Sequence, residues 1–160
     1  MYQRDYILRM IEQMTRTIAT QIMKLREQRK YDEALAATGE LYKKLSLPNP
    51  ALLFKLTVRQ LIDMMTMNGV AHLEKLEAIA TLFKEEAEIR AELGQQEESG
   101  ARLVKALQIH LYLFEEDPQP SRFEAMNGLL EQVDVTLLTP EEQNAVKAYY
   151  AYIEQSGEPD

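Results

Sequence analysis

Apolar side chains recur every three or four residues along most of this chain, which is the spacing of one face of an α-helix. The longest such pattern predicts a first helix over residues 4–28, and a second predicts a helix over 31–45. The alternation typical of strands is nearly absent, with residues 133–138 as its one weak candidate. The first stripe consists of Ile7, Ile11, Met14, Ile18, Ile22 and Leu25. We therefore expect an all-α fold.

Prolines, glycines and polar capping residues predict where the next helices begin and end. Pro48 and Pro50 should end the second helix, because proline disfavours helical geometry in the residue before it. Asn49 can cap a third helix that has Pro50 in its first turn. This third helix should stop at Asn68-Gly69, because glycine accepts the left-handed backbone that ends a helix.

The second half of the chain predicts four further helices. Patterns over 70–93 and 96–114 give the fourth and fifth, with Gly94 as the C-terminal cap of the fourth. Residues 121–124 and 139–142 each read Ser/Thr-x-x-Glu, a capping box that begins a helix. About seven helices result, and we expect the fifth to be the most buried because it is apolar on more than one side.

Composition narrows the class of protein. The 160 residues contain no cysteine, which excludes disulfides, thiol catalysis and zinc fingers. Neither a secretory signal nor an apolar run of about 20 residues occurs, so we expect a cytoplasmic protein outside the membrane. The net charge of -8 disfavours nucleic acid. We expect one domain over residues 1–155 and a disordered acidic tail at 156–160.

Residues 31–45, "YDEALAATGELYKKL", resemble the second helix of a tetratricopeptide hairpin. Residues 82–118 resemble another such hairpin, and Tyr31 and Gln96 are separated by about two periods of that repeat. The matching positions are Tyr31, Ala34, Leu41 and Pro48 in the first segment and Phe83, Ala87, Gly94, Ala106 and Leu107 in the second. The resemblance implies an antiparallel stack of helical hairpins. As a whole the chain also resembles a short all-helical bacterial family of unknown function, which implies no activity.

The tetratricopeptide resemblance also implies a partner-binding surface. The groove-facing side of the first helix in each hairpin would present Arg16, Met23 and Arg26 in one case and Lys84 and Glu88 in the other. This partly basic surface would suit an acidic or polar segment, although the same residues also suit plain exposure to solvent. The leading hypothesis is therefore a non-enzymatic protein–protein interaction or scaffold module that binds a peptide or helix.

No pattern of catalytic, cofactor-binding or metal-binding residues supports an enzyme. His110 lies in an apolar row without a carboxylate three or four residues away, so a core histidine is favoured over a ligand or base. His72 is expected at the surface near a helix start. The alternative that remains is a small-molecule or metal-dependent enzyme in which His110 works with a carboxylate from another helix.

Three apolar features leave further alternatives open. The stripe of the first helix can serve a core or a symmetric interface, which makes a homodimer the structural alternative. The run 64–67 contains three methionines, which can form an adaptable binding surface or fill a core. Tyr149, Tyr150 and Tyr152 cannot all face inward on one helix, so at least one should be exposed.

Overall fold

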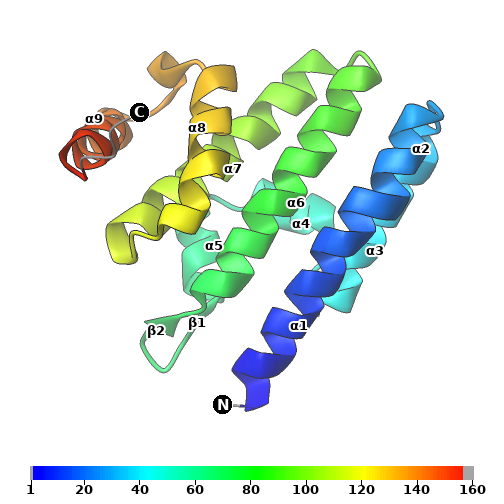
Figure 1. Cartoon of the computed structure of the whole chain (residues 1–160), viewed down its shortest axis with the longest axis horizontal. Helices are drawn as coiled ribbons and strands as arrows, with labels where there is room; N and C mark the ends of the chain where they lie inside the picture. The colour runs from blue at the N-terminus through cyan, green and yellow to red at the C-terminus, as the bar shows by residue number, and fades with distance from the viewer. Residues whose placement is uncertain (1, 157–160) are drawn as a thin grey trace.

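The computed structural model describes residues 2–156, and helices make up most of this range (Figure 1). The predicted all-α class is confirmed. Within that range, no helix is both long and apolar enough to cross a membrane. In chain order the elements are α1 (Tyr2–Thr17), η1 (Ile18–Ile22), α2 (Met23–Glu27), α3 (Tyr31–Lys44), α4 (Pro50–Lys55), α5 (Val58–Met64), β1 (Thr66–Met67), β2 (Val70–Ala71), α6 (Leu73–Glu92), α7 (Gln96–Glu116), η2 (Pro120–Arg122), α8 (Phe123–Gln132), η3 (Val135–Leu137) and α9 (Pro140–Gln155).

The long first helix is present as α1, η1 and α2, which follow one another without a break. Its predicted apolar stripe faces the core, with Met14 and Ile22 buried and the other members partly buried. The middle segment η1 is a π-helical turn, in which the hydrogen-bonded ring is one residue wider than in an α-helix. The periodicity of the stripe does not reveal this turn.

Three helices end on a residue with left-handed backbone. Gly94 after α6 has φ of 83°, which confirms it as the predicted cap, whereas Arg29 after α2 and Ser46 after α3 take φ of 61° and 57° without being glycine. At the end of α3, the Leu47 amide donates to the Tyr42 carbonyl at 2.9 Å. This bond closes a Schellman motif and ends the helix before the prolines are reached.

The prediction of one helix from Pro50 to Asn68 is wrong, because this segment forms two short helices and a hairpin. Thr57 begins α5 with a capping box: its hydroxyl accepts from the Gln60 amide at 3.1 Å, and the Gln60 side chain accepts from the Thr57 amide at 2.9 Å. Asn68 and Gly69 both have positive φ, 54° and 77°, and join β1 to β2. Asn-Gly is the typical sequence of such a two-residue turn.

The two predicted capping boxes of the second half differ in outcome. Thr139 and Glu142 form theirs, with each side chain accepting from the other's backbone amide. The one predicted at Ser121 is wrong, because Pro120–Arg122 forms a 3-10 turn and places Ser121 inside it instead of before α8. Residues 135–137 form a 3-10 turn, so the weak strand candidate is also wrong. Of the predicted tail, residues 157–160 lie outside the described part of the chain.

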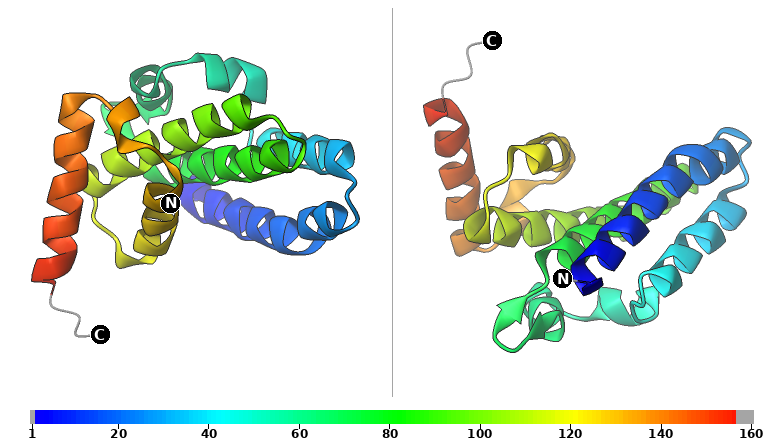
Figure 2. Two further views of the ribbon diagram at one scale, coloured as in Figure 1. Left: turned by 90° about the horizontal axis from the view of Figure 1, so that it is seen from above. Right: turned by 60° about the horizontal axis from the view of Figure 1, so that its bottom comes forward.

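The central helices α6 and α7 are antiparallel and pack side by side along their length (Figure 1). Each contributes about half of its residues to the buried core. On one side α3 and the first helix pack against α6, and on the other side α8 and α9 pack against α7. Figure 2 shows the α1–α3 end and α9 at opposite ends of the molecule. Of the partner-binding residues that the resemblance implies, Arg16, Met23 and Arg26 lie on the first helix, and Lys84 and Glu88 lie on α6.

Candidate functional site

Arg26 and Glu88 are brought together by the structure, but they bind each other. The Arg26 guanidinium reaches three carboxylates of α6: Glu85 at 3.0 Å, Glu88 at 3.4 Å and Glu92 at 2.5 Å. Its side chain is only 16% exposed. Arg26 therefore holds α2 against α6.

The other three predicted partner-binding residues are spread over different surfaces. Arg16 on α1 is 78% exposed and lies 3.9 Å from Glu12, and Met23 is 41% exposed. Lys84 reaches the opposite side of α6, where its Nζ lies 3.9 Å from the position that a Cβ on Gly128 of α8 would take. Of the five, Arg16 borders a hollow that could receive a partner.

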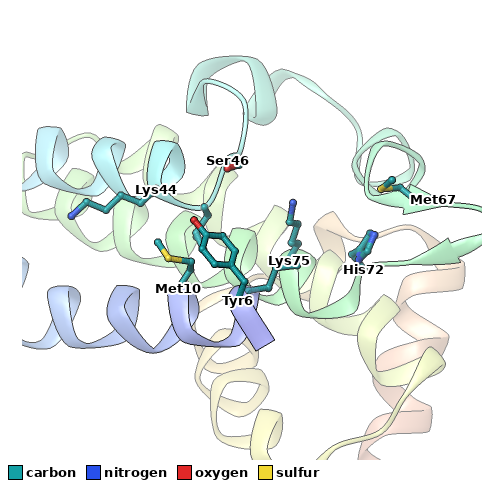
Figure 3. Close-up of a pocket in the computed structure, with 9 residues that line it drawn as sticks. Tyr6, Met10, Lys44, Ser46, Met67, His72 and Lys75 are labelled. Carbon is teal, nitrogen blue, oxygen red and sulfur yellow. The ribbon is translucent and has the colours of Figure 1, made fainter. Parts of the chain in front are cut away.

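A cavity of about 240 Å³ lies where α1, the end of α3, β1 and the start of α6 meet (Figure 3). We call it the apolar pocket, because isoleucine, leucine, methionine and tyrosine side chains make up most of its wall. Figure 3 shows Tyr6 and Met10 on α1, Lys75 on α6, and His72 directly before α6. The full lining is Tyr6, Ile7, Met10, Lys44, Leu45, Ser46, Met67, His72 and Lys75.

Local backbone geometry produces this pocket. The left-handed residue Ser46 ends α3 and turns the chain away, which leaves the end of that helix open. The Asn-Gly turn folds β1 onto β2, and this brings Met67 to the pocket wall with its side chain 60% exposed. Tyr6 on α1 is 54% exposed at the same pocket. Large apolar side chains are thus exposed to solvent beside a cavity.

The charged side chains that line the apolar pocket, among the described residues, are two lysines. Lys44, His72 and Lys75 line it, and none of the lining residues that the structure describes is Asp or Glu. Among the side chains that the structure describes, neither lysine takes part in an ion pair. In a chain of net charge -8 this is a local positive field, which attracts an anionic group.

A second hollow of about 290 Å³ continues the apolar pocket along α1. The two share Met10, Lys44 and Leu45 in their walls. The second hollow, here called the polar hollow, reaches Arg16 and the π-helical turn η1, and its other side chains are mainly threonine and glutamine. Together the two form the α1–α3 groove, which runs from the β-hairpin to η1.

Of the two candidate histidines, His72 lines the apolar pocket and His110 lies elsewhere. His110 is buried, as predicted, and burial together with the nearby Arg122 and Lys84 lowers its pKa to about 4, so it is neutral near pH 7. His72 is half-buried directly before α6. In the part of the chain that the structure describes, no three His, Cys, Asp or Glu side chains are placed to hold a metal ion.

The methionine run and the C-terminal tyrosines divide between core and surface. Met65 is buried, whereas Met64 and Met67 are exposed. Tyr149 is fully buried and donates to Asn127 Oδ1 at 2.7 Å, and Tyr150 and Tyr152 are 49% and 40% exposed. The expectation that at least one tyrosine is exposed is confirmed.

Sequence reasoning missed most of the apolar pocket. Tyr6, Lys44, Ser46 and Lys75 carry no motif, and they meet only because the ends of three helices converge. One local signal was present: Asn68-Gly69 reads as a hairpin turn as well as a helix stop, and the hairpin brings Met67 to the pocket.

Comparisons with protein-family models, with curated proteins and with solved structures found no match for this chain. The chemistry of the α1–α3 groove is therefore the basis for assigning a function.

Proposed function

We propose that this chain is a non-enzymatic interaction module that binds a segment of another protein in the α1–α3 groove. The segment inserts an apolar side chain into the apolar pocket and directs flanking Asp or Glu residues toward Lys44, Lys75 and Arg16. One observation carries the proposal: the described walls of the groove combine apolar side chains with cations and contain no carboxylate, in a chain of net charge -8.

The dimensions of the groove favour a protein segment over a cofactor. Pockets for drug-sized ligands begin at about 300 Å³ and enclose most of the ligand. The two hollows measure about 240 and 290 Å³ and lie end to end. Two adjoining hollows suit consecutive side chains of one segment, with apolar contact in the first and polar contact in the second. Charge complementarity of this kind sets the orientation of a partner and speeds its association.

The proposed architecture is a tetratricopeptide-like stack of two hairpins. The first consists of α1, η1 and α2 with α3, and the second of α6 with α7. Packing of α6 against both α3 and α1 supports this arrangement, as does the full burial of Ala34 where the repeat family requires a small residue. The short helices α4 and α5 and the β-hairpin are inserted between the two hairpins. The proposed binding groove lies within the first hairpin, not on the surface that the resemblance implies.

A peptide-display selection tests the function directly. Short random peptides are selected on the wild-type protein, and their affinities are measured by fluorescence polarisation. We expect selected peptides to carry an aromatic or aliphatic residue next to Asp or Glu. The double variant K44E/K75E should bind them roughly tenfold more weakly or worse, because it replaces attraction by repulsion.

The matched control is K24E/K147E, which reverses two exposed lysines outside the groove and makes the same change in net charge. Its affinity for the peptides should stay within about twofold of the wild type. Equal weakening by both variants would show that only the overall charge matters. Selected peptides without acidic residues would contradict the proposed partner chemistry.

A second copy of the chain is the competing occupant, because Tyr6 and Leu8 on the first helix are 54% and 40% exposed. Sedimentation equilibrium distinguishes the two. A dimer that K44E/K75E leaves intact and that blocks peptide binding would favour the homodimer, whereas a monomer at high concentration removes it.

A further inference from the structure

Met67 is the most exposed methionine among the residues that the structure describes. Its side chain is 60% exposed, against 42% for Met64 and 41% for Met23. It also lines the apolar pocket, where Met10 is the other methionine of the wall (Figure 3). Met64 lies three residues earlier in the chain and lines neither the apolar pocket nor the polar hollow. Met67 is therefore both open to solvent and part of the proposed groove.

The β-hairpin fixes the position of Met67. Successive side chains of a strand point to opposite faces, and β1 consists of Thr66 and Met67. The Thr66 hydroxyl donates to the Ile62 carbonyl at 2.6 Å, so this side chain faces back onto α5. The Met67 side chain is thereby directed to the other face, where the apolar pocket lies. The His72 amide donates to the Met65 carbonyl at 2.9 Å and holds the hairpin closed beside the pocket.

Methionine provides the sulfur chemistry of this chain, which contains eight methionines and no cysteine. Hydrogen peroxide transfers one oxygen atom to a thioether: the O–O bond breaks, an S–O bond forms, the sulfur loses two electrons and water is released. The reaction requires that the oxidant reach the sulfur, so exposure decides which methionines react. Met14, Met65 and Met126 are 2%, 7% and 2% exposed and are shielded from it.

We propose that Met67 is an oxidation site through which hydrogen peroxide releases the partner from the α1–α3 groove. This inference rests on the proposed function, because it concerns the same groove. Oxidation replaces a flexible apolar side chain by a polar sulfoxide. An apolar side chain of the partner would then cover the sulfoxide oxygen without offering it a hydrogen bond, which disfavours binding. A thiol-dependent sulfoxide reductase restores the thioether, with a disulfide on the reductase and water as the other products.

The test is a time course of hydrogen peroxide treatment on the intact protein. At each time point, mass spectrometry of proteolytic fragments gives the oxidised fraction of each methionine. Fluorescence polarisation gives the affinity for a peptide from the display selection. We expect Met67 and Met64 to be oxidised while the buried methionines are spared. The affinity should fall about tenfold or more, in step with the oxidation of Met67.

The matched variants M67L and M64L separate the two exposed methionines. Leucine keeps an apolar side chain of similar size and has no sulfur to oxidise. M67L should bind the peptide within about twofold of the wild type and keep this affinity after peroxide treatment, whereas M64L should lose affinity as the wild type does. M67Q places a polar side chain at the site without any oxidant, and it should bind about tenfold more weakly than M64Q.

Three outcomes overturn the proposal: M67L loses affinity on treatment as much as the wild type, the wild type keeps its affinity after Met67 is fully oxidised, or Met64 is oxidised while Met67 is not. Each of them leaves the proposed function standing, because the untreated protein still binds the peptide. If the untreated protein binds no selected peptide, the proposed function fails and its regulation by Met67 fails with it.

Discussion

The two ends of the first helix differ in whether the cations beside them are in ion pairs. At the α2 end, Arg26 is largely buried and contacts three carboxylates of α6. At the α1 end, Lys44 and Lys75 line the apolar pocket, and neither is in an ion pair with any side chain that the structure describes. The first helix and α6 are therefore joined by ion pairs at the α2 end, whereas at the α1 end a cavity lies between them.

This difference separates cations that stabilise the fold from cations that can attract a partner. A buried guanidinium surrounded by carboxylates cannot be offered to a ligand without breaking its own contacts. An unpaired lysine beside a cavity can bind a ligand without breaking contacts of its own. Exposure and pairing, more than position in a repeat, therefore identify the residues of a binding surface.

The largest expected effect is on Arg26. R26A leaves Glu85, Glu88 and Glu92 close together without their cation, so we expect a loss of about 3 kcal/mol in the free energy of unfolding. R16A on the same helix is the control and should change stability by less than about 0.5 kcal/mol, because Arg16 is 78% exposed. Urea unfolding measures both. Equal effects would remove the contrast between the two ends.

The next effect concerns Tyr42, whose hydroxyl donates to the buried carboxylate of Glu86. Y42F removes this donor and should cost about 2 kcal/mol, whereas Y150F at an exposed position should be neutral. Burial, and secondly Glu86, raises the pKa of Tyr42 above its ordinary 10.0. Wild-type stability should therefore fall as the pH rises above about 10, and Y42F should lose less over that range. Parallel pH profiles for the two proteins would contradict this assignment.

Glu85 should show a smaller effect than its partner Arg26. Burial raises the pKa of Glu85 above 4.5, although Arg26 opposes this. A raised native pKa means that the native state favours the neutral form of Glu85. The stability that Glu85 contributes is therefore largest below pH 4.5 and is lost as the pH rises through the native pKa. E85Q at pH 7 should thus change the free energy of unfolding by less than about 1 kcal/mol. As the pH falls, the wild type should become more stable relative to E85Q. A loss as large as that of R26A would refute this asymmetry.

The smallest effect on stability is expected at the open end. K44E/K75E should alter the free energy of unfolding by less than about 0.5 kcal/mol, because neither lysine is in an ion pair within the described part of the chain. Thermal unfolding followed by circular dichroism checks this value. If the double variant unfolds as readily as R26A, the two ends do not differ and the lysines belong to the fold.

Helices with regular stripes could be predicted from the sequence because periodicity is a local property. The first helix, Gly94 and the Thr139 capping box all follow from residues a few positions apart. The break at Thr57 was also local, since Thr57-x-x-Gln60 is a capping box within an otherwise helical pattern. Asn68-Gly69 fits both a helix end and a hairpin turn, and local sequence does not decide between them.

The candidate site could not be predicted in the same way. Arg26 and Glu85 are 59 residues apart in the chain, and their contact depends on how α2 crosses α6. The apolar pocket likewise depends on where three helix ends meet. The tetratricopeptide resemblance implied a surface that included Arg26 and Glu88, and the contact between these two residues uses the groups that a partner would need.

The π-helical turn η1 determines how the two ends of the first helix are rotated relative to each other. A π turn contains one residue more than an α turn, so it corresponds to a single-residue insertion in a continuous α-helix. Deleting Ala19 would restore regular α-helix and rotate everything beyond it by about 100°. Arg26 would then leave the carboxylates of α6, while the apolar pocket, which lies before the turn, would keep its walls. A one-residue change in length would thus separate the packing of this helix from the apolar pocket, and it would alter only the η1 end of the proposed binding groove.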